Sequence, residues 1–129
     1  MRFTMPPTAS ASWPIPALLV AVVGVALTPW AMMVNPFFSG VVRIQRDRGH
    51  TAVVAGPYRA IRHPGYAGAV LFTLASPVVL GSTWAWIPAL LTTAAILIRL
   101  RLEDELLHRD LQGYAAYAGR VRWRLVPVW

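Results

Sequence analysis

Cysteine is absent from the 129 residues, so the chain forms no disulfide and offers no thiolate as nucleophile or metal ligand. The three histidines, His50, His63 and His108, are widely spaced and form no HxxH or HExxH pattern, so we predict no metal site. Charge is also scarce. Only 13% of residues are charged whereas 57% are hydrophobic, a balance that excludes an ordinary soluble domain and indicates a single-domain integral membrane protein.

The charge that is present has one dominant sign and no lysine. All 12 basic residues are arginines, and five acids leave a net charge of +7. Such a balance can indicate nucleic acid, but here the arginines flank apolar runs, where positive charge marks the cytoplasmic side of a membrane and meets anionic lipid. We therefore expect membrane lipid and no nucleic acid as partner. The Arg-rich, Ala-rich and Lys-free composition favours a bacterial inner membrane.

The apolar runs predict an all-α, polytopic membrane protein with about three transmembrane helices. Residues 13–34 make the first, since about 22 residues at ~1.5 Å each exceed the ~30 Å hydrocarbon core. Residues 66–80 and 83–100 read as a helical hairpin with short legs and an uncharged outer turn. Five arginines between the first two runs place that side in the cytoplasm and the N-terminus outside: Arg43, Arg46, Arg48, Arg59 and Arg62.

Two further segments complete the single domain, residues 1–129. Val41 to His50 is basic and predicts a short helix. The third apolar run keeps helix-forming residues to about Leu111, so residues 101–129 form a cytoplasmic helix and a C-terminal segment. Tyr114 to Pro127 mixes aromatic residues with arginine, which predicts an interfacial helix or a lid lying on the bilayer.

The polar residues concentrate in Gly56 to Gly68, with the sequence GPYRAIRHPGYAG. Pro57 and Pro64 favour a shaped loop over a regular helix. Buried loop backbone must be satisfied, and a bound ligand is one way to do so. The segment is therefore either a cofactor-binding segment at a membrane surface or an interfacial loop whose arginines meet lipid phosphates.

Charged residues also follow the third apolar run. Arg99 and Glu103 are four residues apart and share a helix face, as do Arg101 and Glu105. They form either two surface ion pairs worth a few tenths of a kcal/mol each or, for Arg99 and Glu103 at the membrane boundary, a functional site.

Four motifs occur in order along Asn35 to Trp129: GPYRAIRHPGYAG, a hydrophobic hairpin, Arg99-x-x-x-Glu103-Asp104-x-x-Leu107, and Gly113-Tyr114-x-x-Tyr117 before an Arg-rich end. In this arrangement the chain closely resembles the isoprenylcysteine carboxyl methyltransferase family, whose wider group includes phospholipid N-methyltransferases. The resemblance implies S-adenosylmethionine-dependent methyl transfer at the membrane–cytosol boundary. It also implies that polar loops over a helical bundle hold the cofactor.

Carried over by position, the resemblance assigns the catalytic roles to Arg99, Glu103 and His63, with Arg99 orienting the acceptor. The cofactor-binding positions it implies are His50, Thr51, Ala52, Val53, Tyr58, His63, Pro64, Gly65, Tyr66 and Glu103. There are departures from the family pattern. A glutamine that contacts the cofactor in the family falls on Arg43, which puts that contact in doubt, and Asp104 replaces the usual second glutamate.

The acceptor stays open among several lipidic or small hydrophobic molecules. Arg99 suits a carboxylate or phosphate, and the resemblance favours an isoprenylcysteine-type carboxylate. A phospholipid amine or a small thiol would instead need a base, for which His63 and His50 are the candidates. Many relatives carry more N-terminal helices, so substrate choice depends on those helices or on a second copy of this chain in a homo-oligomer. A non-catalytic membrane subunit is the alternative of another class.

Overall fold

The computed structural model describes residues 14–125 and 129, and in this part of the chain all regular structure is helical. The elements, in chain order, are α1 (Pro14–Val34), η1 (Arg46–Arg48), η2 (Gly56–Arg59), α2 (Pro64–Leu80), α3 (Trp86–Asp110) and α4 (Tyr114–Arg120), where η marks a short 3₁₀ helix. The predicted all-α class is confirmed. Predictions that involve Trp13, the residues before it and Pro127 lie outside the described residues.

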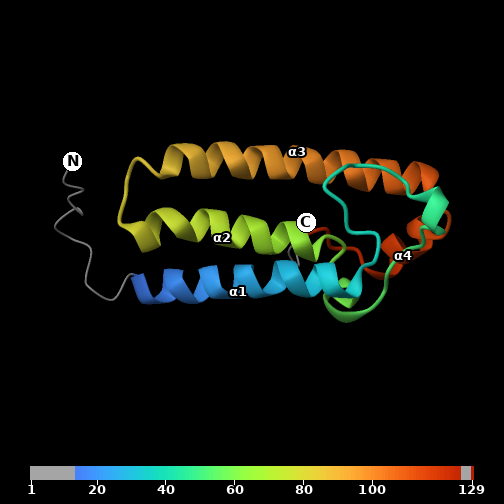
Figure 1. Ribbon diagram of the computed structural model, residues 1–129, viewed down its shortest axis with the longest axis horizontal. Helices are drawn as coiled ribbons and strands as arrows, with labels where there is room; N and C mark the ends of the chain where they lie inside the picture. Colours follow the sequence, from blue (N-terminus) through green and yellow to red (C-terminus); the bar gives the residue numbers. More distant parts are fainter. Residues whose placement is uncertain (1–13, 126–128) are drawn as a thin grey trace.

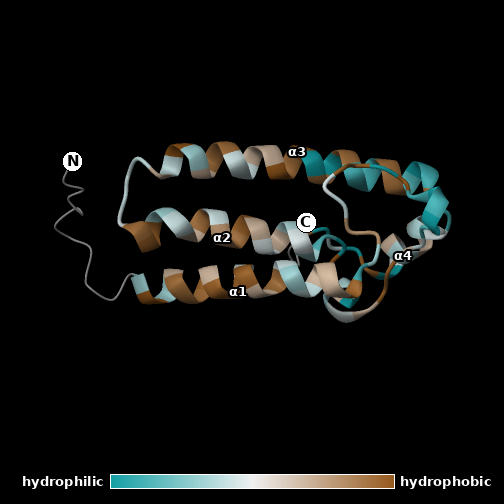
Figure 2. Ribbon diagram, in the orientation of Figure 1, coloured by the Kyte–Doolittle hydropathy of each residue, from teal (hydrophilic) through white to brown (hydrophobic). Residues whose placement is uncertain are grey.

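The three long helices lie side by side and run alternately up and down (Figure 1). One end of this bundle carries the turn between α2 and α3. At the opposite end lie α4, η1, η2 and the long connection between α1 and α2. The polar residues of the chain gather at that second end, while brown, hydrophobic residues dominate the helices elsewhere (Figure 2).

Helices α1 and α2 pack with their backbones in close contact. A Cβ atom added at Gly24 would lie only 2.6 Å from the carbonyl oxygen of Gly68, so only glycine fits at this crossing. Beside it, the hydroxyl of Thr28 donates a hydrogen bond of 3.1 Å to the carbonyl oxygen of Gly65. Small residues and short polar side chains are the usual means of helix association in membranes. This contact fixes the start of α2, and with it Tyr66, against α1.

The outward faces of the helices are apolar. Leu19 and Met33 on α1, Phe72 on α2 and Leu91 on α3 are all exposed, and a contiguous apolar surface of this kind indicates lipid contact. In the described residues one helix, α1, is both long and apolar enough to cross a membrane. Helix α2 is apolar but spans only 17 residues, about 26 Å at ~1.5 Å per residue. The predicted count of three membrane spans therefore stays a prediction.

The predicted helix boundaries are close to those observed, with small differences. Helix α2 begins at Pro64, two residues before the predicted start, because proline at the first helical position lacks an N–H that would have no partner there. Helix α3 begins at Trp86, after a turn. It continues past the apolar run to Asp110, as predicted.

One local prediction is wrong. Val41 to His50 is not a helix beyond the three residues of η1, because Gly49 ends the turn in the left-handed conformation with φ of 64°. The C-terminal segment forms the short helix α4, as predicted, and its position on a bilayer stays a prediction. Tyr114 and Tyr117 are buried at 4% and 2% exposure, in a cluster with Leu107 and Tyr58. This segment closes the end of the bundle.

The glycine contact between α1 and α2 gives a matched pair of variants. In Gly68→Ala the new methyl group would collide with Thr28 and with the Gly24 carbonyl oxygen, 2.7 Å away, whereas Gly119→Ala in α4 meets nothing within 4 Å. We expect Gly68→Ala to lose about 1–3 kcal/mol of stability through overpacking. Gly119→Ala should retain parental stability. Thermal unfolding midpoints in one detergent measure both, and equal midpoints would contradict the close packing.

Candidate functional site

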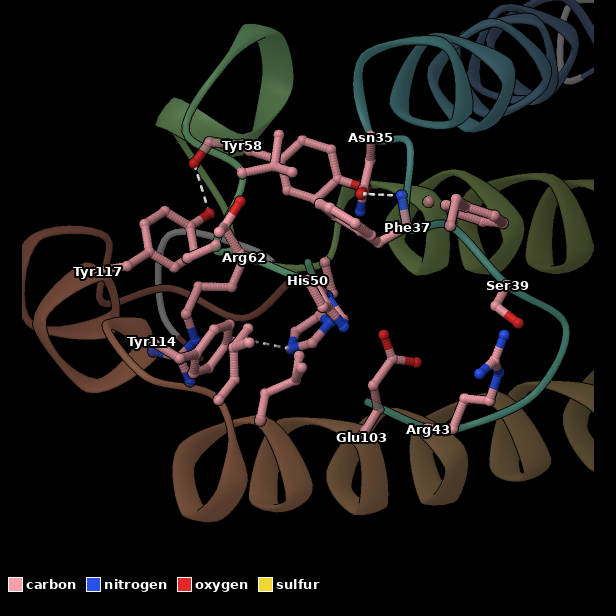
Figure 3. Close-up of a pocket in the computed structure, with 18 of the residues that line it drawn as sticks. Asn35, Phe37, Ser39, Arg43, His50, Tyr58, Arg62, Glu103, Tyr114 and Tyr117 are labelled. Atoms are coloured by element: carbon pink, nitrogen blue, oxygen red, sulfur yellow. Dashed lines mark hydrogen bonds between the residues drawn. The ribbon is translucent and has the colours of Figure 1, made fainter. Parts of the chain in front are cut away.

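A pocket opens at the polar end of the bundle (Figure 3). It encloses about 680 Å³, counting the part open to solvent. Side chains reach it from the connection after α1, from η2, from the start of α2 and from the C-terminal half of α3, with α4 closing one side. Segments that are far apart in sequence thus meet at one place.

Most of the predicted cofactor-binding residues line this pocket, namely His50, Thr51, Ala52, Val53, Tyr58, His63, Gly65, Tyr66 and Glu103. Pro64 does not; it is buried as the first residue of α2. Arg99 does not line the pocket either. Whether the lining residues bind a cofactor stays a prediction, but the structure brings them together.

A buried carboxylate organises the wall behind the pocket. Asp104 is 2% exposed and meets the Arg62 guanidinium in a two-pronged ion pair, with Nε 3.1 Å from Oδ1 and Nη2 2.9 Å from Oδ2. The remaining Arg62 nitrogen, Nη1, donates to the backbone carbonyl of Arg122 at 3.0 Å. Every nitrogen of this buried guanidinium is therefore bonded within the protein.

Three other side chains bond the same carboxylate. His63 Nε2 lies 2.9 Å from Oδ1, the Tyr114 hydroxyl donates to Oδ1 at 2.9 Å, and Arg124 Nε donates to Oδ2 at 3.1 Å. Burial alone would raise the pKa of Asp104, but hydrogen bonds from His63 and Arg62 outweigh it and hold the pKa well below its ordinary range. Asp104 therefore stays ionised. Its hydrogen bonds connect α3 to the residues before α2, to α4 and to the residues that follow α4.

Tyrosines fix η2 against its neighbours. The Tyr117 hydroxyl donates 2.6 Å to the backbone carbonyl of Tyr58, and Asn35 Nδ2 donates 3.0 Å to the Tyr58 hydroxyl. Burial raises the pKa of both Tyr58 and Tyr117, so both remain neutral. The Tyr58 ring is thereby held at the pocket wall between α1 and α4.

Glu103 and Arg99 do not form the direct ion pair that their spacing allows. Tyr66 lies between them: its hydroxyl donates to Glu103 Oε2 at 2.5 Å and accepts from Arg99 Nε at 2.8 Å. Arg99 Nη2 donates to the backbone carbonyls of Ser39 and Gly40. Arg99 thus ties the connection after α1 to α3, while Glu103 alone presents its carboxylate to the pocket (Figure 3).

The two pocket histidines are held in different ways. His50 Nδ1 accepts a 3.1 Å hydrogen bond from the backbone N–H of Gln45, and its ring stacks on Phe37 with centroids 4.4 Å apart. Burial lowers the pKa of His50, so the ring is neutral and its proton is on Nε2. His63 Nε2 lies beside the ionised Asp104 carboxylate, so this nitrogen carries a proton and donates a hydrogen bond to Oδ1.

The sequence prediction missed the residues that build the Asp104 network. The sequence indicates Asp104 only as a departure from the family pattern and gives it no role. It indicates Arg62 only as one of the arginines that meet lipid phosphates or mark the cytoplasmic side. Two signals were present in the sequence: Asp104 is next to Glu103, and Arg62 is next to His63. Neither identifies a partner, because the ion pair joins positions 42 residues apart.

The chain is thus a helical protein with apolar outer faces and a polar pocket at the helix ends, features typical of a membrane-associated protein. The comparison with known families agrees with this class. Residues 17–109 match the isoprenylcysteine carboxyl methyltransferase (ICMT) family. Because the match covers most of the chain, the chain belongs to this family, and its membership supports a methyltransferase function. No curated protein sequence matches the chain at a significant level.

Removing the central charge should destabilise the protein. In Asp104→Asn, Arg62 would remain buried without a counter-charge, which typically costs roughly 3–5 kcal/mol. The matched control is Asp110→Asn, whose carboxylate pairs with Arg109 at the exposed end of α3 and should leave stability unchanged. Unfolding by denaturant in one detergent compares the two, and an equal effect of both substitutions would contradict the role given to Asp104.

The same carboxylate gives stability a pH dependence. Because the folded-state pKa of Asp104 lies below its unfolded value of about 3.9, its contribution is fully present above that pH and is lost as the pH falls through the folded pKa. The stability gap between the parent and Asp104→Asn should therefore shrink as the pH is lowered from about 7 toward about 3. Unfolding midpoints across that range measure the gap, and a constant gap would argue against an ionised Asp104.

Proposed function

We propose that the chain is an S-adenosylmethionine-dependent methyltransferase that acts at the membrane–cytosol interface on a lipidic or small hydrophobic acceptor. Family membership supports the methyl transfer. The location at the membrane interface and the hydrophobic acceptor are supported by the position of the pocket. It gathers a carboxylate and aromatic side chains at the point where apolar helices end. A membrane-dissolved acceptor and a water-soluble methyl donor can meet at such a boundary.

The lining residues fit the proposed cofactor chemically. Glu103 offers a carboxylate for the α-ammonium group, a charge-assisted bond. Phe37, Tyr58 and Tyr66 offer ring faces for a purine or for a positively charged sulfur. The enclosed volume, about 680 Å³ with the open part included, falls in the ~300–1,000 Å³ range of small-molecule sites.

When bound, S-adenosylmethionine would supply a methyl group carried on a sulfonium. The protein's own contribution is mainly alignment, which in favourable model systems is worth about 7–11 kcal/mol. Tyr66 holds the Glu103 carboxylate through its hydroxyl, and Arg99 holds Tyr66 in turn. Arg99 is thus a positioning residue, while Glu103 and the pocket rings would make the direct contacts.

The nature of the acceptor decides whether a base is needed. A carboxylate acceptor has no proton to lose and is the form that the family description favours. For an amine or thiol, we propose His63 as the base, because it lines the pocket and bonds Asp104 through Nε2, whereas His50 Nδ1 is already bonded to Gln45. We favour a carboxylate of the isoprenylcysteine type.

We further propose that the pocket faces the cytoplasm of a bacterial inner membrane. The long connection between α1 and α2 and the segment before α2 carry the arginines that the positive-inside rule assigns to the cytoplasmic side. The opposite end, at Gly81 and Ser82, has no charged residue.

Cofactor binding is tested with a matched pair of glutamate variants. Glu103→Gln removes the charge that faces the pocket, so we expect at least a tenfold loss of affinity for S-adenosylhomocysteine. Glu105→Gln, on the same helix but outside the pocket lining, should bind like the parent. Calorimetric titration of purified protein measures all three. Equal affinities would contradict the site, and no binding by the folded parent would favour a non-catalytic subunit.

The acceptor class is tested by the product. With a methyl-labelled donor and an S-prenylated cysteine, we expect label in a methyl ester, which dilute base releases as methanol. Label that resists base would instead point to an amine or thioether, and so to a phospholipid or thiol acceptor. The Glu103→Gln variant supplies the background for both measurements.

A further inference from the structure

A pocket for an amino-acid zwitterion needs a cation as well as the Glu103 carboxylate, and the arginines nearest the pocket differ in what they can offer. Arg62 lines the pocket, but its guanidinium is bonded through Nε and Nη2 to Asp104 and through Nη1 to a backbone carbonyl. Arg99 is bonded to Tyr66 and to the carbonyls of Ser39 and Gly40. Arg62 therefore has every nitrogen engaged, and Arg99 lies outside the lining of this pocket.

Arg43 is the other arginine that lines the pocket within the described residues. Its side chain is 48% exposed, and its ion pair is with Asp47, four residues on, at 3.4 Å and also exposed. Exposed ion pairs contribute little to stability, so a ligand carboxylate can replace Asp47 at little cost. Arg43 therefore retains most of its capacity to bind an anion.

Arg43, on the connection after α1, and Glu103, on α3, line the same pocket and are drawn next to one another in Figure 3. His50 lines this pocket as well. The geometry of His50, with Nδ1 bonded to the Gln45 N–H, leaves Nε2–H as a donor. The pocket thus has an anion-accepting side next to its carboxylate.

We propose that Arg43, with His50 Nε2–H as second donor, is the carboxylate-binding residue of this pocket. The inference rests on the proposed function and adds the ligand group at this subsite. The carboxylate has two sources in that function, the amino-acid end of the methyl donor and the acceptor itself. An arginine fork binds either one with two parallel hydrogen bonds. At this position the resemblance to the family expects a neutral glutamine, so the charge is a property of this chain.

The test compares Arg43→Gln with Arg46→Gln. Both remove one positive charge from the same segment, but Arg46 does not line the pocket. Calorimetry uses S-adenosylhomocysteine and its decarboxylated analogue, which keeps the ammonium group. If the carboxylate belongs to the donor, Arg43→Gln should weaken S-adenosylhomocysteine binding about 10- to 100-fold and leave the analogue unchanged. Arg46→Gln should bind both like the parent.

A second arm addresses the acceptor. It measures binding of an N-acetylated, S-prenylated cysteine and of its carboxamide, in which the carboxylate is neutral. If the acceptor supplies the carboxylate, Arg43→Gln should lose affinity for the acid alone, while binding of S-adenosylhomocysteine stays at the parental level. Asp47→Asn, which removes the competing anion, should tighten whichever ligand is affected.

The outcomes separate this inference from the proposed function. Binding by the parent with equal affinities in Arg43→Gln and Arg46→Gln, in both arms, would overturn the role of Arg43 and leave the function intact. Absence of S-adenosylhomocysteine binding by the folded parent would overturn both. If Arg43→Gln lost affinity equally for S-adenosylhomocysteine and for its decarboxylated analogue, the effect would be one of general charge. That result would also overturn the assignment of Arg43.

Discussion

The Asp104 carboxylate accepts hydrogen bonds from Arg62, His63, Tyr114 and Arg124, which come from three segments besides its own helix. Hydrogen bonds to a charged group contribute about 1.5–3 kcal/mol each when they are well made. The segment before α2 and helix α4 also pack through a buried apolar cluster that contains Tyr58, Leu107, Tyr114 and Tyr117. The buried charge adds hydrogen bonds of fixed direction, which hold these segments over the end of α3 behind the pocket.

Glu103 and Asp104 are adjacent in sequence but lie in different environments, and helix geometry explains why. Residues 103 and 104 lie about 100° apart around α3, so one turns toward the pocket and the other toward the wall behind it. Glu103 is partly exposed and bonds Tyr66, whereas Asp104 is buried and fully bonded. The shorter aspartate side chain suits the enclosed position. A carboxylate that lines the pocket and one that is buried in the wall thus come from two consecutive residues.

The membrane accounts for the rest of the architecture. Three helices with apolar outer faces would expose too much hydrophobic surface in water, but in lipid their association depends on close backbone contact, as at Gly24 and Gly68. In residues 14–125, charges gather at one end, where they can meet both water and lipid headgroups. The proposed function depends on this placement, because a pocket at that end can be reached from both phases.

Much of this could be predicted from sequence. The apolar runs predicted the three long helices to within a few residues, because hydrophobic length is a local property. Of the ten cofactor-binding positions that the family resemblance implies, all but Pro64 line the pocket. The contacts of Asp104 and Arg99 could not be predicted, since they join residues far apart in the chain and depend on how loops fold over the helices.

The failures have the same origin. Val41 to His50 carries helix-compatible residues, yet the bonds that Gln45 makes to Phe37 and Arg48 hold it as a loop. For Arg43 the sequence and the structure differ in the other direction. The family pattern has a glutamine that contacts the cofactor at this position, so the arginine puts that contact in doubt. In the structure Arg43 nevertheless lines the pocket together with Glu103.

Hydrogen–deuterium exchange in lipid nanodiscs, with and without S-adenosylhomocysteine, tests the central claim most directly, because it locates binding along the chain. The account predicts slower exchange on binding in residues 50–53 and 56–63 and around Glu103. Exchange at the opposite turn, residues 81–85, should not change. Protection confined to that turn, or saturable binding with no protection in the pocket segments, would contradict a site built on the Asp104 framework.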